Sequence, residues 1–141
     1  MRQLTLFDDS TPNLSGVIPA VRAAMNRAAG ESAEGRKLLV DRINAIARSH
    51  NLRLTRGNAR VISKDLLDKW LAPHDRDHTP SLLAVVVFCH ATGDFGPLEA
   101  ILRTFGLGIL TPEVLRDAHF GRAVKEEKLA RKRRRQLEET L

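Results

Sequence analysis

The chain has 141 residues, which suits one compact domain with a tail, and 43% of them are hydrophobic, enough for a core. Its 23 Lys and Arg residues outnumber its 17 Asp and Glu residues, and the formal net charge of +6 indicates an acidic partner, nucleic acid first and an anionic membrane second. A single cysteine, Cys89, excludes an intramolecular disulfide and a zinc finger. The N-terminus has no long apolar segment of the signal-peptide kind, and the longest apolar run, residues 82–89, is too short to span a membrane. We therefore expect a cytoplasmic protein.

Apolar residues at helical spacing predict two helices in the first third of the chain. Residues 1–15 form an N-terminal arm that ends in polar and turn-forming residues. The first helix runs from about Gly16 to Ala29, and Gly30 ends it. Ser32 caps a second helix, which ends near residues 50–51.

The next segment contains the one place where a strand is considered. Leu52–Ile62 alternates apolar and polar residues, which predicts an extended loop or a small hairpin. Ser63 then caps a short third helix, Lys64–Leu71, with Trp70 on its apolar face. Pro73 ends this helix.

Three more helices follow. Thr79 as N-cap with Pro80 at the first helical position predicts the start of a fourth helix, Ser81–Ala91, which is apolar on most sides and should be buried. A fifth helix covers Phe95–Phe105 and ends at Gly106. Thr111, followed by a proline, begins a sixth helix that continues to the C-terminus.

We therefore predict an all-α fold: a compact bundle of about five short helices with a helix-turn-helix-like unit and a long basic C-terminal helix. The expected organisation is an arm at residues 1–15, a helical domain of the DNA-binding type at residues 16–110 and a basic helix or tail at residues 111–141.

The positive charge is concentrated in two segments. Residues 16–60 hold nine basic and three acidic residues, and residues 116–141 hold nine basic and five acidic residues. Residues 61–115, by contrast, hold four basic and seven acidic residues. The two basic segments are candidate phosphate contacts, and the apolar segment between them is a candidate scaffold or partner-facing surface.

Asp41–Leu71 is arranged as a helix, a connection and a second short helix, as in helix-turn-helix proteins, whose short helix enters the major groove. The connection of about ten residues is longer than usual, and the helix that follows it is electrically neutral. Lys64 and Lys69 are its candidate groove contacts. The alternative is a structural helix pair with Trp70 in the core.

Two basic clusters are further candidates for phosphate contacts. The connection carries Arg53, Arg56, Asn58 and Arg60 beside a glycine, and loop arginines can clamp phosphates or enter a minor groove. The C-terminal segment carries five consecutive bases: Arg131, Lys132, Arg133, Arg134 and Arg135. Flanking glutamates can pair with some of them, but five consecutive bases cover every side of a helix and cannot all be paired internally, so this run could bind DNA or RNA. The alternative for both clusters is a solvated surface.

No pattern predicts catalysis, a cofactor or a metal. His74 and His78 have the spacing of two metal ligands on a helix, but flanking prolines place them in a turn. Cys89 is adjacent to His90 within an apolar run, so core packing explains it better than a catalytic pair does. A phosphate-binding glycine loop and a nucleophilic serine elbow are absent. We expect no enzyme.

The central residues resemble small regulatory proteins encoded by Mu-like and lambdoid prophages. The stretches concerned are ISKDLLDKWLAP at 62–73, HTPSLL at 78–83 and FCHATGD at 88–94. In these proteins a helix ending in Lys-Trp-Leu precedes a proline-started helix and an Ala-Thr-Gly stop. The lambda-type lysogeny activators are a more distant likeness, on a tryptophan followed by a Leu-Leu-Ala-Val helix, here Leu82–Val85.

The resemblance covers roughly Leu38–Leu110. It implies a cytoplasmic helix-turn-helix protein that acts on transcription as an oligomer, with Ser63, Lys64 and Lys69 on its reading helix. The long connection and the acidic residues on that helix depart from the family's pattern.

These observations together favour a phage or prophage DNA-binding protein, a transcriptional regulator that contacts double-stranded DNA and not a membrane. We expect a homo-oligomer, because Leu82–Phe88 and Leu98–Leu110 offer more apolar area than a small domain must hide. The alternative is a protein-interaction module, a phage factor that binds a host or phage protein without reading DNA. A third interpretation is RNA binding through the tail alone.

Overall fold

The computed structural model describes residues 14–140, so the predicted arm at residues 1–15 lies outside the described residues except for its last two positions. Within residues 14–140 every regular element is helical, which confirms the all-α prediction. Leu52–Ile62 is an irregular loop and not a hairpin. The chain divides into two units, one that extends to Gly108 and one from Ile109 onward. No helix in the described part is long and apolar enough to cross a membrane.

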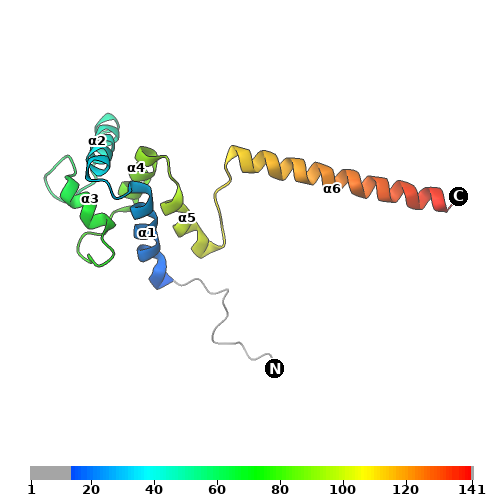
Figure 1. The fold of residues 1–141 in the computed structure, drawn as a ribbon, viewed down its shortest axis with the longest axis horizontal. Coiled ribbons are helices and arrows are strands. Elements are labelled where there is room, and N and C mark those ends of the chain that lie inside the picture. The colour runs from blue at the N-terminus through cyan, green and yellow to red at the C-terminus, as the bar shows by residue number, and fades with distance from the viewer. Residues whose placement is uncertain (1–13, 141) are drawn as a thin grey trace, which may run out of the picture. The chain divides into compact units, whose positions relative to one another are not determined.

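Five short helices build the first unit. They are α1 (Val17–Ala29), α2 (Ala33–Ser49), α3 (Lys64–Leu71), α4 (Leu82–Thr92) and α5 (Gly96–Leu102), with short 3-10 turns at Leu14–Gly16 and Arg103–Phe105. Helix α1 lies between α3 and α5, and α2 packs against α4 (Figure 1). The second unit holds one helix, α6 (Pro112–Glu139).

The helix starts follow the predicted caps with one exception. The side chains of Ser32, Ser63 and Thr111 each accept a hydrogen bond from a backbone N–H three residues later, at 3.1 to 3.2 Å. The predicted cap of α4 at Thr79 is wrong, because Ser81 accepts the bond from the Ala84 N–H at 3.1 Å. The Thr79 hydroxyl instead accepts a hydrogen bond from Arg22 of α1.

The core of the first unit is built around α4. Phe88 and Ala84 are fully buried, and they pack in one cluster with Met25 of α1, Ile43 of α2 and Leu67 of α3. Trp70 belongs to the same cluster and is 3% exposed, which is the place that the structural alternative for this helix pair predicts. Cys89 is also buried there, as expected. Helix α3 is therefore held by its apolar face, which leaves its charged residues to the surface.

One buried charge joins α1 to the loop between α3 and α4. Arg22 is 2% exposed, and its Nη1 donates to the carbonyl oxygens of both Ala72 and Asp75. Its Nη2 donates to the His78 carbonyl at 3.1 Å and to the Thr79 hydroxyl at 3.2 Å. A buried guanidinium needs such acceptors, because an unpaired charge in the interior is costly. The arginine therefore determines the course of residues 72–79.

Two further polar contacts position α3 and the loop before it. The Arg36 guanidinium donates to the Asp68 carboxylate, to the Asn26 side chain and to the Gly30 carbonyl, each at 2.9 Å, and so ties α2 to α3 and α1. The Asn44 side chain bonds both backbone groups of Ile62, accepting from its N–H at 2.8 Å and donating to its carbonyl at 3.0 Å. These bonds hold the end of the loop against α2.

Candidate nucleic-acid interface

The loop at residues 50–63 is attached to the first unit at both ends. Asn51 has a positive φ of 52°, a conformation that asparagine tolerates better than most residues, and it follows His50, the C-cap of α2. The next N–H, that of Leu52, donates to the Ala47 carbonyl at 2.8 Å. Leu54 and Ile62 are buried in the core. The loop is therefore held to the core at Leu54 and Ile62, and the residues between them lie at the surface.

Three arginines from this region line one surface hollow of about 340 Å³. Arg48 comes from the last turn of α2, whereas Arg53 and Arg60 come from the two limbs of the loop. The remaining lining residues are Ala47, Asn51 and Leu52, so among the described residues no carboxylate lines the hollow. The structure thus brings two of the predicted loop arginines together and adds a third from a helix.

These three guanidinium groups are available to an external anion. Arg48, Arg53 and Arg60 are all exposed, and none forms an ion pair or a side-chain hydrogen bond with another described residue. Like charges gathered in one hollow repel one another, and an anion bound between them relieves that repulsion. Guanidinium groups also match phosphate oxygens with paired N–H donors. A phosphate group is the ligand that this arrangement fits best.

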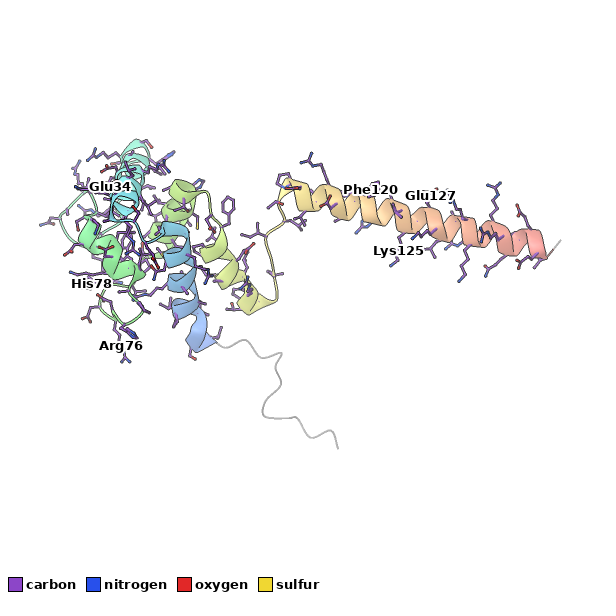
Figure 2. The ribbon with its side chains drawn as sticks, viewed as in Figure 1. Glu34, Arg76, His78, Phe120, Lys125 and Glu127 are labelled. Atoms are coloured by element: carbon purple, nitrogen blue, oxygen red, sulfur yellow. The ribbon has the colours of Figure 1, made fainter. Side chains whose placement is uncertain are left out.

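The other two loop residues lie at the tip. The Thr55 hydroxyl donates to the Ala59 carbonyl at 2.7 Å and closes a short turn, in which Arg56 and Asn58 are exposed. Arg56 lines a second hollow, of about 530 Å³, on which Arg76 also borders. Arg76 lies at the outer edge of its loop (Figure 2). This second hollow is mixed in charge, because Asp77 also lines it.

Helix α3 offers little positive charge. Lys64 is half-buried and its Nζ lies 3.0 Å from the Asp68 carboxylate, which Arg36 also contacts. Burial by itself would raise the pKa of Asp68, but the hydrogen bonds and charges of Lys64 and Arg36 outweigh it and lower the pKa. Lys69 is exposed and so is the acidic Asp65. Ser63 is exposed and uses its hydroxyl as the N-cap.

The predicted tail cluster lies on α6 and is divided between two environments. Arg131 contacts the Glu127 carboxylate at 2.6 Å, and Arg134 lies 3.6 Å from that of Glu138. Lys132, Arg133 and Arg135 form no ion pair with another described residue and are exposed. Glutamates therefore pair with part of the run, as the sequence indicated.

The histidines and the cysteine show no catalytic arrangement among the described residues. No group of three or more metal-binding side chains occurs there. His78 instead approaches the Asp75 carboxylate at 3.0 Å, and hydrogen bonds from His78 and Asp77 lower the pKa of Asp75 against a raising effect of burial. Burial raises the pKa of the Cys89 thiol. A buried thiol of raised pKa is a poor nucleophile.

Sequence reasoning did not single out Arg48 as a site residue. Its position off the apolar face of the second helix was visible, and so was its place in the last turn, directly before the arginine-bearing loop. What could not be seen was the backward turn at Asn51, which returns Arg53 to the end of α2. Arg76 was also missed, since it lies far from the loop in sequence.

Comparison with known proteins brings no family to this chain. The scan against protein-family models, the search of curated proteins and the search of solved structures each found no match.

Proposed function

We propose that the first unit binds the phosphate backbone of double-stranded DNA. The observation that carries the proposal is the hollow lined by Arg48, Arg53 and Arg60. Its three guanidinium groups are exposed and pair with no described residue, and no carboxylate of the described residues lines it. Contacts to phosphate supply much of the affinity of DNA-binding proteins and fix their register on the duplex. A cluster of arginines on a rigid helix end and an anchored loop suits that role.

The remaining predicted residues take secondary roles in this proposal. Arg56 and Asn58 are exposed at the loop tip, and in this proposal they contact a groove beside the bound phosphates. Lys69 is the exposed base of α3, whereas Lys64 already bonds Asp68, so α3 contributes less to base reading than the helix-turn-helix comparison implies. The setting that we propose is the one the resemblance implies, a prophage regulator of transcription.

The test is a matched comparison of charge-removing variants. Arg53→Gln with Arg60→Gln removes two arginines from the hollow. Arg27→Gln with Arg103→Gln removes two exposed arginines from another hollow of the same unit, where Glu99 is a neighbour. Binding of a fluorescent duplex is measured by anisotropy across a salt series.

We expect Arg53→Gln with Arg60→Gln to reduce the slope of log affinity against log salt by about two units. Each phosphate contact that is lost removes about 0.9 from this slope. The control variant changes the net charge equally but should flatten the slope by well under one unit. Equal effects of the two variants, or no binding by the wild-type protein at about 50 mM salt, would contradict the proposal.

A second candidate function is contact with another copy of the chain, and exposed apolar residues at the start of α4 support it. Leu82 and Leu83, at the start of α4, are 68% and 40% exposed, and Leu83 lines a hollow of about 330 Å³ beside Ile46 and Val86. Most of the segment Leu82–Phe88, however, is buried in the core and is not available as a dimer surface. Sedimentation of the wild-type protein and of Leu82→Gln with Leu83→Gln tests this self-association.

A further inference from the structure

The bases of α6 fall into two sets, those that contact a glutamate four residues away and those that pair with no described residue. The paired bases Arg131 and Arg134 share one face with Glu127 and Glu138, the acids to which they bind. A different face carries five exposed bases that pair with no described residue. These are Arg122, Lys125, Lys128, Lys132 and Arg135, and we call this set the basic stripe.

The spacing of the basic stripe makes it continuous. Its members are separated by three or four residues, so at 3.6 residues per turn they fall within about 140° of the helix surface. At a rise of about 1.5 Å per residue, the stripe from Arg122 to Arg135 is about 20 Å long. Figure 2 shows Lys125 of the stripe on the side of α6 opposite Glu127 and Phe120.

Two properties of the helix favour a nucleic acid over a lipid surface or a packed helix partner. The large apolar residues of α6 form no continuous apolar face along its length. Five are exposed, namely Val114, Leu115, Phe120, Leu129 and Leu137, and Val124 is half-buried. A membrane-surface helix needs one broad apolar face to insert, and a coiled coil needs an apolar seam. A line of bases without an apolar face suits regularly spaced phosphates instead.

We propose that the basic stripe of α6 is a second DNA contact, which lies along the phosphate backbone of the duplex. The proposal rests on the DNA binding proposed for the first unit, and it assigns to the tail a different set of residues from the run Arg131–Arg135. Arg131 and Arg134 already contact Glu127 and Glu138, so we expect each of them to contribute less than a base of the stripe. Arg122, Lys125 and Lys128, which lie before the run, contribute as much as Lys132 and Arg135.

Two double variants of the full chain separate the faces. Lys125→Gln with Lys132→Gln removes two bases from the middle of the basic stripe, and Arg131→Gln with Arg134→Gln removes two bases from the paired face. Each pair lowers the net charge by two and keeps residues of good helix propensity. Circular dichroism verifies that both variants retain the helix, and anisotropy with duplex DNA across a salt series measures binding.

The stripe variant should flatten the salt slope by about 1.8, which makes the affinity change between about 50 and about 200 mM salt roughly tenfold smaller. The paired-face variant should flatten it by less than half as much. Lys125→Arg with Lys132→Arg should bind as the wild type does. Equal salt slopes for the two glutamine variants would contradict the assignment of DNA binding to the basic stripe. If the wild-type protein binds anionic vesicles more tightly than duplex DNA, DNA is not the ligand of the stripe. Either result leaves the comparison of Arg53 and Arg60 variants intact, so a failure of the basic stripe can be told apart from a failure of the first proposal.

Discussion

Replacement of Arg22 by methionine should destabilise the first unit strongly. Methionine keeps much of the length of the side chain and its packing against the core, but it removes all the donors that serve the loop at residues 72–79. In the wild-type protein the guanidinium satisfies the carbonyl oxygens of Ala72, Asp75 and His78 and the Thr79 hydroxyl.

The size of the effect follows from these four acceptors. At roughly 1 kcal/mol for each hydrogen bond lost, the variant loses about 4 kcal/mol. Some of this is recovered, because the buried Nε, which has no hydrogen-bond partner among the described residues, is removed together with the charge. We therefore expect a net loss of about 3 kcal/mol in the free energy of unfolding, a large part of the stability of a small domain. Arg22→Lys keeps the charge but cannot span four acceptors, so it should lose about 1 to 2 kcal/mol.

Urea unfolding monitored by tryptophan fluorescence measures this change. Trp70 is the one tryptophan of the chain and is buried in the core of the first unit, so its emission reports unfolding of that unit and not of α6. The free energy of unfolding is obtained by linear extrapolation to zero urea. A midpoint for Arg22→Met that corresponds to less than about 0.5 kcal/mol of destabilisation would refute the argument that this buried charge holds the loop.

Three further outcomes are expected. Asn44→Ala removes both bonds to the Ile62 backbone and should lower the free energy of unfolding by about 1 to 2 kcal/mol, measured as for Arg22; an unchanged urea midpoint would contradict this. Asp68→Asn should destabilise the protein at neutral pH, and the gap to the wild type should narrow as pH falls below about 4. The pKa of Asp68 is lowered in the folded state, so its stabilising effect is present above the unfolded pKa and is lost as the folded carboxylate protonates. A stability gap that does not narrow as the pH is lowered from neutrality through the titration of Asp68 counts against the ion pair with Lys64. Cys89 should react slowly with an aromatic disulfide reagent in the folded protein and rapidly in urea, because its thiol is buried and its pKa is raised; rapid reaction without urea would show that the core opens easily.

The helices could be predicted because the signals that start and end them are local. Ser32, Ser63 and Thr111 cap helices through backbone groups only three residues away, so the residue type and its neighbours suffice to identify the cap. The same local reasoning failed at Thr79, where two hydroxyl residues competed for one helix start. The Thr79 hydroxyl bonds Arg22, 57 residues earlier, whereas Ser81 caps the helix.

The candidate site was likewise predictable where it depends on local sequence and not where it depends on tertiary contacts. The basic loop and the basic tail are visible as composition, and so is the neutral character of the third helix. Their grouping is not, because it depends on how the chain folds back on itself. Arg48 joins Arg53 and Arg60 only after the turn at Asn51. Arg36 reaches Asp68 only because α2 packs beside α3, whereas the Lys64–Asp68 contact is local to one turn of α3.

Residue order alone was therefore enough to establish an all-α chain, the approximate ends of its helices and the segments that carry excess positive charge. These depend on interactions within a turn or two of helix, or on composition. Tertiary packing decided which basic side chains are exposed together and which are paired. Arg22 and Arg36 bond residues that are distant in sequence, His78 and Asp68. Arg53 and Arg60 bond none of the described residues. A charge is free to bind a phosphate only where the fold leaves it without a partner, and that is a property of tertiary contacts.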